Sequence, residues 1–148
     1  MKASLISTFL LLATATRIQK AAGASSGEEQ LWDAAYNNNV DLVKSLIDSG
    51  VDAKATNYYG GTALMLAAKY GRVKLVELLL PKSDAKATTS SGYSALMMAA
   101  RYGHDKLVEL LLPKSDAKAT NNQGKTAADI AQSRGYNQIV RLIQRYSN

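Results

Sequence analysis

The sequence predicts an all-α fold, a solenoid of stacked helix-turn-helix units. The stretch KLVELLLPKSDAKAT runs from Lys74 to Thr88 and recurs, letter for letter, 32 residues later at Lys106 to Thr120. Gly60, Gly92 and Gly124 keep the same spacing. Within each copy, apolar residues recur three and four positions apart, which is the spacing of one helix face. A fixed period of this length is typical of repeat proteins, whose units bury their apolar faces against one another.

Residues 1–27 precede the repeats and differ from them in composition. They contain no Asp or Glu, and a mostly apolar run, ASLISTFLLLATAT, follows Lys2. A basic residue, an apolar run and a small-x-small site such as residues 13–15 have the layout of a secretory signal peptide. We therefore predict a signal peptide or leader with a flexible linker, and a secreted or periplasmic protein. An organelle transit peptide or an uncleaved membrane anchor is the alternative.

Half of the net charge of the chain lies in this leader. The whole chain carries +6, but residues 28–148 carry only +3, because three of the 18 basic residues and none of the 12 acidic residues lie in the leader. The folded part is thus only mildly basic, which argues against a dedicated nucleic-acid binder. Because no later segment has about 20 successive apolar residues, we expect no stable membrane span in the mature chain.

Residues 28–148 divide into four units, at about 28–57, 58–89, 90–121 and 122–148. The first contains LWDAAYNNNVDLVKSLIDSGVDAKAT, a weaker copy of the repeat. Its single tryptophan, Trp32, is interpreted as a packing residue. Together the four units are predicted to form one domain.

The second unit shows how each element is expected to form. Thr62 is placed to cap the first helix by accepting a backbone N–H bond from the next turn. Gly71 is expected to end this helix with a left-handed residue. Pro81 predicts the end of the second helix, because proline lacks a backbone N–H and disfavours helical angles at Leu80. The apolar stripes consist of Leu64, Ala67 and Ala68 in the first helix, then Val73, Val76, Leu79 and Leu80 in the second.

The third and fourth units repeat this plan. GYSALMMAARYGHDKLVELLL and GKTAADIAQSRGYNQIVRLIQ align with GGTALMLAAKYGRVKLVELLL of the second unit. Met65, Met97 and Met98 fall on the core pattern of the first helices and are predicted to fill the core. Helices this short are marginal alone, so their stripes must be buried between units, where alanines allow close approach.

The pattern G-x-T-A-L-M-x-A-A-x-Y-G, followed by L-V-E-L-L-L and D-A-K-A, resembles the ankyrin repeat, whose period is about 33 residues and whose signature is T-P-L-H-x-A. The likeness covers residues 28–148. It implies an ankyrin repeat solenoid of helix-turn-helix units joined by β-hairpin loops, curved with a concave face. The spacing here is one residue shorter, and Met65 and Met97 stand where the signature has histidine. We expect apolar packing to replace the family's polar network at those positions.

The sequence holds no catalytic or metal-binding motif. There is no cysteine and only one histidine, His104, which excludes thiol chemistry and the usual zinc sites. His104 follows Gly103 where a second helix is expected to begin and is interpreted as a turn residue. Asp84 and Asp116 occupy equivalent turns, where Asp bonds its own backbone. Because phosphate-binding, zinc-protease and serine-nucleophile motifs are also missing, we predict a non-enzymatic protein that uses no metal and no cofactor.

The resemblance implies partner binding at the hairpin tips and at the exposed ends of the first helices, on the concave side. Tyrosines and cations are concentrated there, and Tyr and Arg dominate many binding hot spots. We expect a monomer that binds another protein, and an acidic partner would match the cations. The predicted partner-binding residues are Tyr36, Tyr58, Tyr59, Lys69, Tyr70, Tyr93, Arg101, Tyr102, Lys125 and Arg134.

Two other functions remain open. The same cations and stacking tyrosines suit a basic-face binder of nucleic acid or another polyanion, and a purely structural role is the third hypothesis. Lys54, Lys86 and Lys118, one in each loop, form either a solvated edge or a basic strip. Salt separates a protein partner from a polyanion, because binding to phosphates weakens steeply as ionic strength rises.

Overall fold

The computed structural model describes residues 26–148. Within this range eight α-helices form four helix-turn-helix pairs. The first helices are α2 (Gly27–Tyr36), α4 (Ala63–Lys69), α6 (Ala95–Arg101) and α8 (Ala127–Ser133). The second helices are α3 (Val40–Asp48), α5 (Val73–Leu79), α7 (Asp105–Leu111) and α9 (Asn137–Ser147), and 3₁₀ turns follow at Leu80–Lys82 and Leu112–Lys114.

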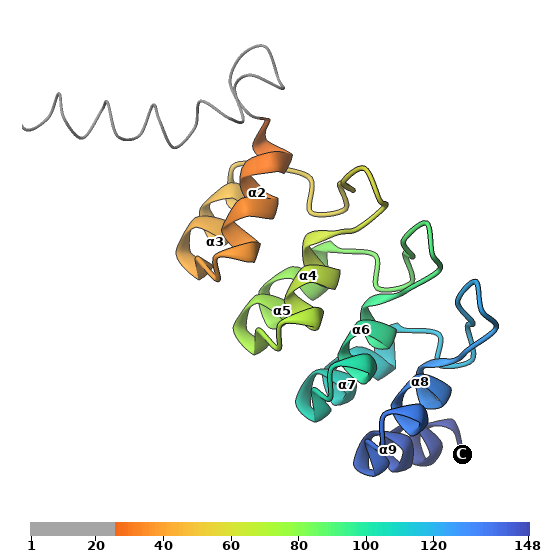
Figure 1. The fold of residues 1–148 in the computed structure, drawn as a ribbon. Helices are drawn as coiled ribbons and strands as arrows, with labels where there is room; N and C mark the ends of the chain where they lie inside the picture. Colours follow the sequence, from red (N-terminus) through yellow and green to blue (C-terminus); the bar gives the residue numbers. More distant parts are fainter. Residues whose placement is uncertain (1–25) are drawn as a thin grey trace, which may run out of the picture.

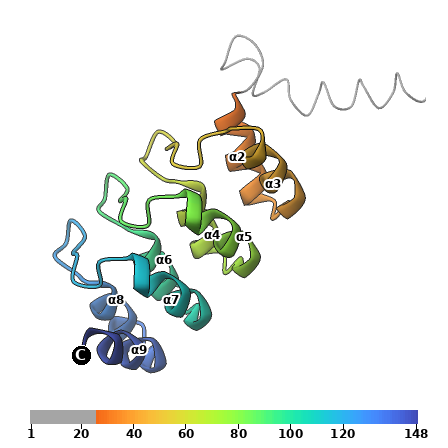
Figure 2. The ribbon, with the colours of Figure 1, turned by 180° about the vertical axis from the view of Figure 1, so that it is seen from behind.

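The four pairs stack in sequence order, and the loops that join them all project from the same side of the stack (Figures 1 and 2). This is the predicted all-α solenoid. The predicted leader lies outside the described residues except for Ser26 and Gly27. Those two belong to the folded domain, because the Ser26 side chain caps α2 by accepting the N–H of Glu29 at 3.1 Å.

Hydroxyl side chains begin the other first helices, as predicted. Thr62 accepts the N–H of Met65 at 3.2 Å. Ser94 and Thr126, at the same position of the next two units, accept from the residues three positions on, also at 3.2 Å. Each bond satisfies one of the N–H groups that the start of a helix leaves without a partner. At the other end of α4, Gly71 takes the predicted left-handed conformation, with φ of 71°.

The ends of α5 and α7, the second helices of the two middle units, differ from their prediction. α5 stops at Leu79, but Leu80 keeps helical angles (φ −55°, ψ −44°), and the chain makes one 3₁₀ turn that contains Pro81. Proline is tolerated in the first turn of a helix, where its missing N–H has no role. Leu80 packs against the core, and this packing outweighs the preference of a residue before proline for extended angles.

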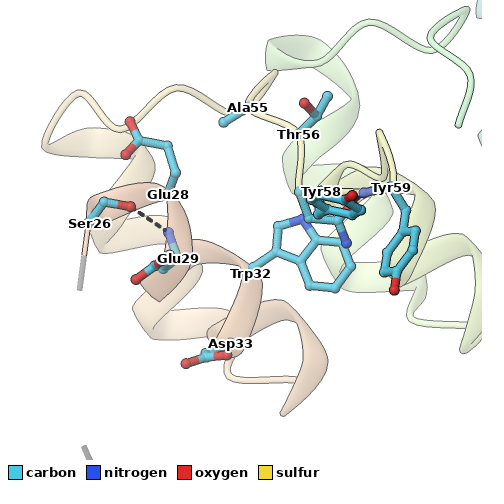
Figure 3. Close-up of a pocket in the computed structure, with 10 residues that line it drawn as sticks. Ser26, Glu28, Glu29, Trp32, Asp33, Ala55, Thr56, Tyr58 and Tyr59 are labelled. Atoms are coloured by element: carbon cyan, nitrogen blue, oxygen red, sulfur yellow. Dashed lines mark hydrogen bonds between the residues drawn. The ribbon is translucent and has the colours of Figure 1, made fainter. Parts of the chain in front are cut away.

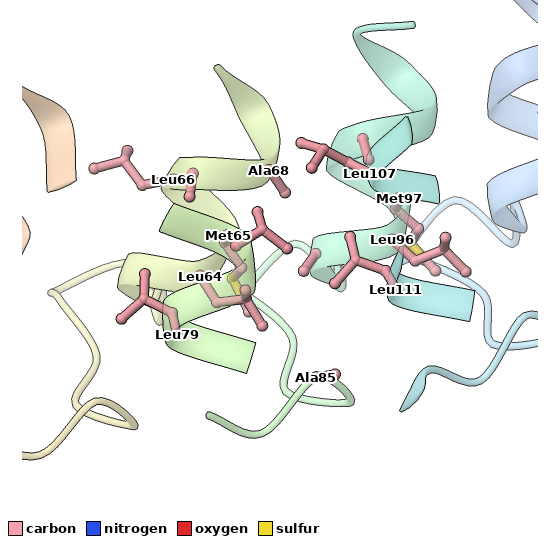
Figure 4. Close-up of a cluster of buried hydrophobic side chains, with 14 of the residues drawn as sticks. Leu64, Met65, Leu66, Ala68, Leu79, Ala85, Leu96, Met97, Leu107 and Leu111 are labelled. Atoms are coloured by element: carbon pink, nitrogen blue, oxygen red, sulfur yellow. The ribbon is translucent and has the colours of Figure 1, made fainter. Parts of the chain in front are cut away.

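One continuous hydrophobic core runs through all four units. Figure 4 shows its middle, where leucines of the second and third units lie between the helices. Met65 and Met97 are 3% and 1% exposed, so apolar packing does replace the histidine of the family signature there. Successive first helices contact one another more extensively than successive second helices do, because buried alanines such as Ala67 and Ala99 keep them close. The first helices therefore form the more closely packed layer of the stack.

Each loop contains a turn at an aspartate, as predicted for Asp84 and Asp116. The Oδ1 atoms of Asp52, Asp84 and Asp116 accept the backbone N–H two residues on, at 2.9, 3.0 and 3.0 Å. Each loop then closes into a hairpin-like tip, in which the N–H groups of Asn57, Thr89 and Asn121 donate to the carbonyl oxygens four residues on, at 2.9 Å each. Residues 26–148 contain no extended β-strand, so each hairpin is limited to its tip.

Neighbouring tips are joined to one another. The N–H of Ser90 donates to the carbonyl of Tyr59 at 3.0 Å, and the N–H of Asn122 donates to the carbonyl of Ser91 at 3.1 Å. These bonds align the three loops in one layer beside the first helices. No helix in the described part of the chain is long and apolar enough to cross a membrane.

Candidate functional site

Aromatic rings and cations form a row across the ends of α2, α4 and α6. Tyr36 and Tyr70 meet edge to face, with ring centroids 5.8 Å apart and an interplanar angle of 86°. The Lys69 ammonium lies 5.3 Å from the centroid of Tyr70 and 5.7 Å from that of Tyr102, and so bridges two units. We call this set the aromatic–cation row, and it consists of Tyr36, Lys69, Tyr70, Tyr93, Arg101 and Tyr102.

Arg101 continues the row into the third unit. Its guanidinium lies 5.8 Å from the centroid of the Tyr102 ring and 5.5 Å from that of Tyr93. The Tyr93 hydroxyl accepts a hydrogen bond from Arg101 Nη1 at 2.9 Å. Cation–π geometry of this kind holds a flexible side chain over a ring, so the arginine is preorganised in the free protein.

The period of the chain explains why these residues meet. Tyr36, Lys69 and Arg101 are the last residues of α2, α4 and α6, and Tyr70 and Tyr102 follow directly. Stacking therefore places the corresponding helix ends of neighbouring units side by side, and contacts form between residues 33 and 34 apart in sequence, Lys69 with Tyr102 and Tyr36 with Tyr70. The tyrosines remain accessible, because Tyr36, Tyr70 and Tyr102 are 58%, 41% and 38% exposed, whereas Tyr93 and the two cations are half-buried.

Lys125 and Arg134 lie beyond the row, in the fourth unit. Together with Arg101 and Tyr93 they line a pocket of about 250 Å³ between α6, α8 and the third loop. The structure thus brings eight of the ten predicted partner-binding residues into one continuous strip across the units. Whether this strip binds a partner remains a prediction.

The remaining two predicted residues, Tyr58 and Tyr59, lie apart from this strip. Their rings contact each other edge to face at 5.3 Å, and they are 94% and 67% exposed at the tip of the first loop. They line a second pocket, of about 560 Å³, together with Trp32 of α2 and three acidic residues (Figure 3). Among the residues that the structure describes, no ring contact links this pair to the aromatic–cation row. The acidic residues of the pocket are Glu28, Glu29 and Asp33.

Several pocket residues were not among the predicted site residues, and Trp32 and Asn121 are two of them. Trp32 packs against the core as expected, but it also lines the pocket beside Tyr58 and Tyr59, and its Nε1 donates to the carbonyl of Gly61 at 3.2 Å. Asn121 lines the pocket beside Arg101 and Lys125 and is only 5% exposed. A signal for Asn121 does exist in the sequence, because Asn57, Thr89 and Asn121 hold the same repeat position just before the loop tips.

His104 and Asp129 have structural partners. His104 Nε2 lies 2.9 Å from the carbonyl oxygen of Lys69, so it donates to the last turn of α4, consistent with its predicted role in a turn. Hydrogen bonds from Thr126 lower the pKa of Asp129, with a smaller contribution from the charge of Lys125. No group of three or more His, Cys, Asp or Glu side chains within residues 26–148 is placed to hold a metal ion.

Comparison with known proteins agrees with this architecture. A family model described as ankyrin repeats (3 copies) matches residues 5–90, 31–122 and 81–148. The chain is 33% identical over 70 residues to Ankyrin repeat, SAM and basic leucine zipper domain-containing protein 1 of Ovis aries, which covers 47% of this chain and 15% of that protein. Its Bos taurus counterpart is 38% identical over 56 residues, covering 38% and 12%.

A plant protein shows a similar partial likeness. The protein named Probable E3 ubiquitin-protein ligase XBOS33, of Oryza sativa subsp. japonica, is 40% identical over 47 residues, covering 32% of this chain and 9% of that protein. The chain therefore spans less than a sixth of the length of each of these relatives. The family model, by contrast, matches nearly the whole sequence. The repeat pattern, the stacked helix pairs and this match together show that the chain belongs to the ankyrin repeat family.

Proposed function

We propose that this protein is a non-enzymatic protein–protein interaction module that binds its partner through the aromatic–cation row. Ankyrin repeats are in general such modules. The observation that carries the proposal is the row itself, in which exposed rings, and cations held over them, lie at equivalent ends of the first helices. Tyr58 and Tyr59, at the first loop tip, extend the proposed face.

The physical properties of the row suit protein recognition. Tyrosine provides a large, stiff contact area at a small cost in side-chain entropy. The rings sit on helix ends that a continuous core holds in place, so little order has to be gained on binding. Lys69 and Arg101 are already held over the rings, which places positive charge beside apolar surface.

A protein with acidic residues near apolar ones fits this surface best. The cations of the row are flanked by Lys125 and Arg134 and would pair with carboxylates. A nucleic acid fits less well, because residues 28–148 carry a net charge of only +3 and phosphate-driven binding requires many cations.

The proposal has two further parts. The protein acts without catalysis, and the name of the rice relative does not change this, because only 9% of that protein aligns. Export to a secreted or periplasmic location is proposed from the composition of residues 1–27. N-terminal sequencing of the protein purified from its source tests export, since an intact Met1 would contradict cleavage.

Site-specific photo-crosslinking tests the binding face. A photoreactive phenylalanine analogue replaces Tyr70 in one tagged protein and Tyr146 in another. Tyr146 is 53% exposed but lies on α9, outside the row. We expect covalent capture of one partner protein from position 70 and none from position 146. Equal capture from both positions would show that the row is not the binding face.

Alanine variants measure the contribution of the row. The double variant Tyr70→Ala and Tyr102→Ala is expected to weaken partner binding at least about tenfold, as loss of central aromatic contacts does. Its unfolding midpoint should stay close to that of the parent, because both rings are more than a third exposed. Tyr146→Ala serves as the matched control with unchanged binding. A loss of folding in the double variant would mean that these tyrosines are structural.

The salt dependence of binding separates a protein partner from a polyanion. Raising NaCl from about 50 to 200 mM lowers the affinity for DNA by roughly 10³–10⁵ when six to ten phosphates are contacted. For a tyrosine-centred interface we expect a change of only a few fold over the same range. A steep decline would favour the polyanion alternative.

A further inference from the structure

The pocket beside α8 is lined by two residues whose buried hydrogen-bond donors have no acceptor within residues 26–148. It has a volume of about 250 Å³ and lies between the third loop and the facing sides of α6 and α8. Asn121 and Arg101 contribute to its walls, and Lys125 and Arg134 are its more exposed cations. Both walls come from rigid parts of neighbouring units, so the pocket exists only because the two units stack.

Asn121 points its amide in a defined direction. Its Oδ1 accepts the N–H of Gln123 at 2.9 Å and the N–H of Lys125 at 3.0 Å. Because only the oxygen can accept these two bonds, the positions of oxygen and nitrogen in the amide are assigned by the network. The Nδ2 is therefore a donor, it is buried, and no acceptor for it exists within the described residues. The whole residue is only 5% exposed.

Arg101 adds a second donor of the same kind. Its Nη1 is engaged by the Tyr93 hydroxyl at 2.9 Å, whereas its Nε is buried without an acceptor in residues 26–148. A buried donor that lacks an acceptor is destabilising, because it has lost its hydrogen bonds to water. Asn121 and Arg101 line the same pocket, so an acceptor that enters it is a candidate partner for both donors.

The charges around the pocket define the kind of acceptor. Arg101, Lys125 and Arg134 line it with positive charge, and Asp129 is the only acidic residue among its lining residues. The Asp129 carboxylate is committed to the start of α8, where its Oδ2 accepts the N–H of Thr126 at 3.0 Å. The pocket is therefore electropositive and suited to an anion.

We propose that this pocket binds the side-chain carboxylate of an Asp or Glu residue in an acidic segment of the protein partner. The Nδ2 of Asn121 and the Nε of Arg101 would each donate to the carboxylate, and the ammonium of Lys125 and the guanidinium of Arg134 would neutralise it. A volume of about 250 Å³ is sufficient for a carboxylate and its short stem. This inference rests on the proposed function, because the acidic segment belongs to the partner that the aromatic–cation row binds.

The first loop provides a natural control for this site. Asn57 makes the same turn, with its Oδ1 accepting from Tyr59 N at 3.0 Å and from Gly61 N at 2.8 Å. The pocket beside it is lined by Glu28, Glu29 and Asp33 in place of cations. The geometry of the loop is thus shared by the two sites, and the charge of the pocket is opposite.

Titrations followed by NMR test the proposal directly. The full chain, labelled with ¹⁵N, is titrated with a short Glu-rich peptide, with the same peptide carrying Gln in place of Glu, with inorganic phosphate and with a single-stranded oligonucleotide. We expect the side-chain resonances of Asn121 Nδ2 and Arg101 Nε to shift saturably with the Glu-rich peptide only. Stronger responses to phosphate or to the oligonucleotide would overturn the carboxylate assignment. No response to any probe would overturn the assignment of this pocket as an anion site.

Matched variants identify the groups responsible. Asn121→Asp keeps an oxygen that can accept both loop N–H bonds, but it removes the donor and adds a negative charge, so we expect at least a tenfold loss of peptide affinity. Asn57→Asp makes the same change in the first loop and should leave the affinity unchanged. Arg134→Gln, at an exposed position, should lower the affinity several fold and weaken its salt dependence, and it keeps the test valid if Asn121→Asp destabilises the loop. Unchanged affinity in both Asn121→Asp and Arg134→Gln would overturn the proposal.

The two proposals fail in different ways. If Asn121→Asp leaves capture from position 70 and peptide binding intact, the pocket assignment is wrong and the binding face stands. If capture from position 70 is absent although the Glu-rich peptide still shifts the Asn121 resonance, the proposed function is wrong and the pocket remains a carboxylate site.

Discussion

At the scale of single residues, Thr126 and Asp129 form a reciprocal cap at the start of α8. The Thr126 hydroxyl accepts the N–H of Asp129 at 3.2 Å, and the Asp129 carboxylate accepts the N–H of Thr126 at 3.0 Å. Only the fourth unit has this arrangement among the described helices, because the second and third units carry Met65 and Met97 at the position of Asp129. A carboxylate in the first turn is further stabilised by the helix dipole.

This cap predicts a specific dependence of stability on pH. The bonds from Thr126 lower the pKa of Asp129 below its ordinary value of 3.8. Folding therefore favours the ionised form, and the contribution to stability is complete above about pH 4 and is lost as the pH falls through the lowered pKa. We expect Asp129→Asn to reduce the urea midpoint at neutral pH and to leave it equal to that of the parent near pH 2. A constant difference at both pH values would assign the effect to something other than the charge.

Thr126→Ala removes the hydroxyl half of the same cap and provides the control for this prediction. It should cost about 1 kcal/mol, as the loss of an N-cap does. This cost should persist at low pH, because the Thr126 hydroxyl does not titrate.

At the scale of elements, the loops are held by the backbone of their neighbours. Gly92 takes a φ of 83° at the tip of the second loop, and a Cβ there would lie 2.9 Å from both Asn121 Cα and Asn122 N. Gly124 has the same role in the third loop, with a φ of 75°, but a Cβ there would meet nothing within 4 Å. The two glycines thus share a conformation and differ in their surroundings.

This pair separates the cost of backbone conformation from the cost of crowding between loops. Gly124→Ala should cost about 1–2 kcal/mol, the usual penalty for a left-handed residue with a Cβ. Gly92→Ala should cost about 1–3 kcal/mol more, because the backbone of the third loop must move away. The effect of alanine on the unfolded chain is common to both variants and cancels. Equal unfolding free energies for the two variants would show that the contacts between tips do not stabilise the stack.

The caps and turns were predicted from the sequence more successfully than the helix ends. The difference is in how far apart in sequence the interacting residues are. The caps at Thr62 and Ser94 and the turns at Asp84 and Asp116 depend on residues two or three positions away, so the local pattern was sufficient. The 3₁₀ turn through Pro81 was missed, because packing of Leu80 on the core outweighs a local preference.

The candidate site shows the same division. The repeat register placed tyrosines and cations at equivalent helix ends, and the structure shows that six of them touch. The separation of Tyr58 and Tyr59 from the row could not be predicted, because it depends on the rotamers and the spacing of neighbouring units. The unpaired donors of Asn121 and Arg101 could not be predicted either, because a donor can be seen to lack an acceptor only when the positions of all its neighbours are known.

At the scale of the whole molecule, each unit contacts only its neighbours, so the stability of the stack is expected to be a sum of unit and interface terms. The chain offers two independent probes of this behaviour. Trp32 is the only tryptophan, and it reports on the contact between the first and second units through its bond to Gly61. Far-UV circular dichroism reports on all the helices together.

Weakening the fourth unit should therefore separate these two signals. Ile139 is fully buried in α9, and Ile139→Ala should remove about 2–5 kcal/mol. Because the first two units do not contact α9 directly, we expect part of the circular dichroism signal to be lost at lower urea concentration than the Trp32 fluorescence transition. Val43→Ala, fully buried in α3, is the mirror variant and should bring the fluorescence transition first. Coincident transitions in both variants would show that the four units unfold as one cooperative body, in which case the interfaces outweigh any single unit.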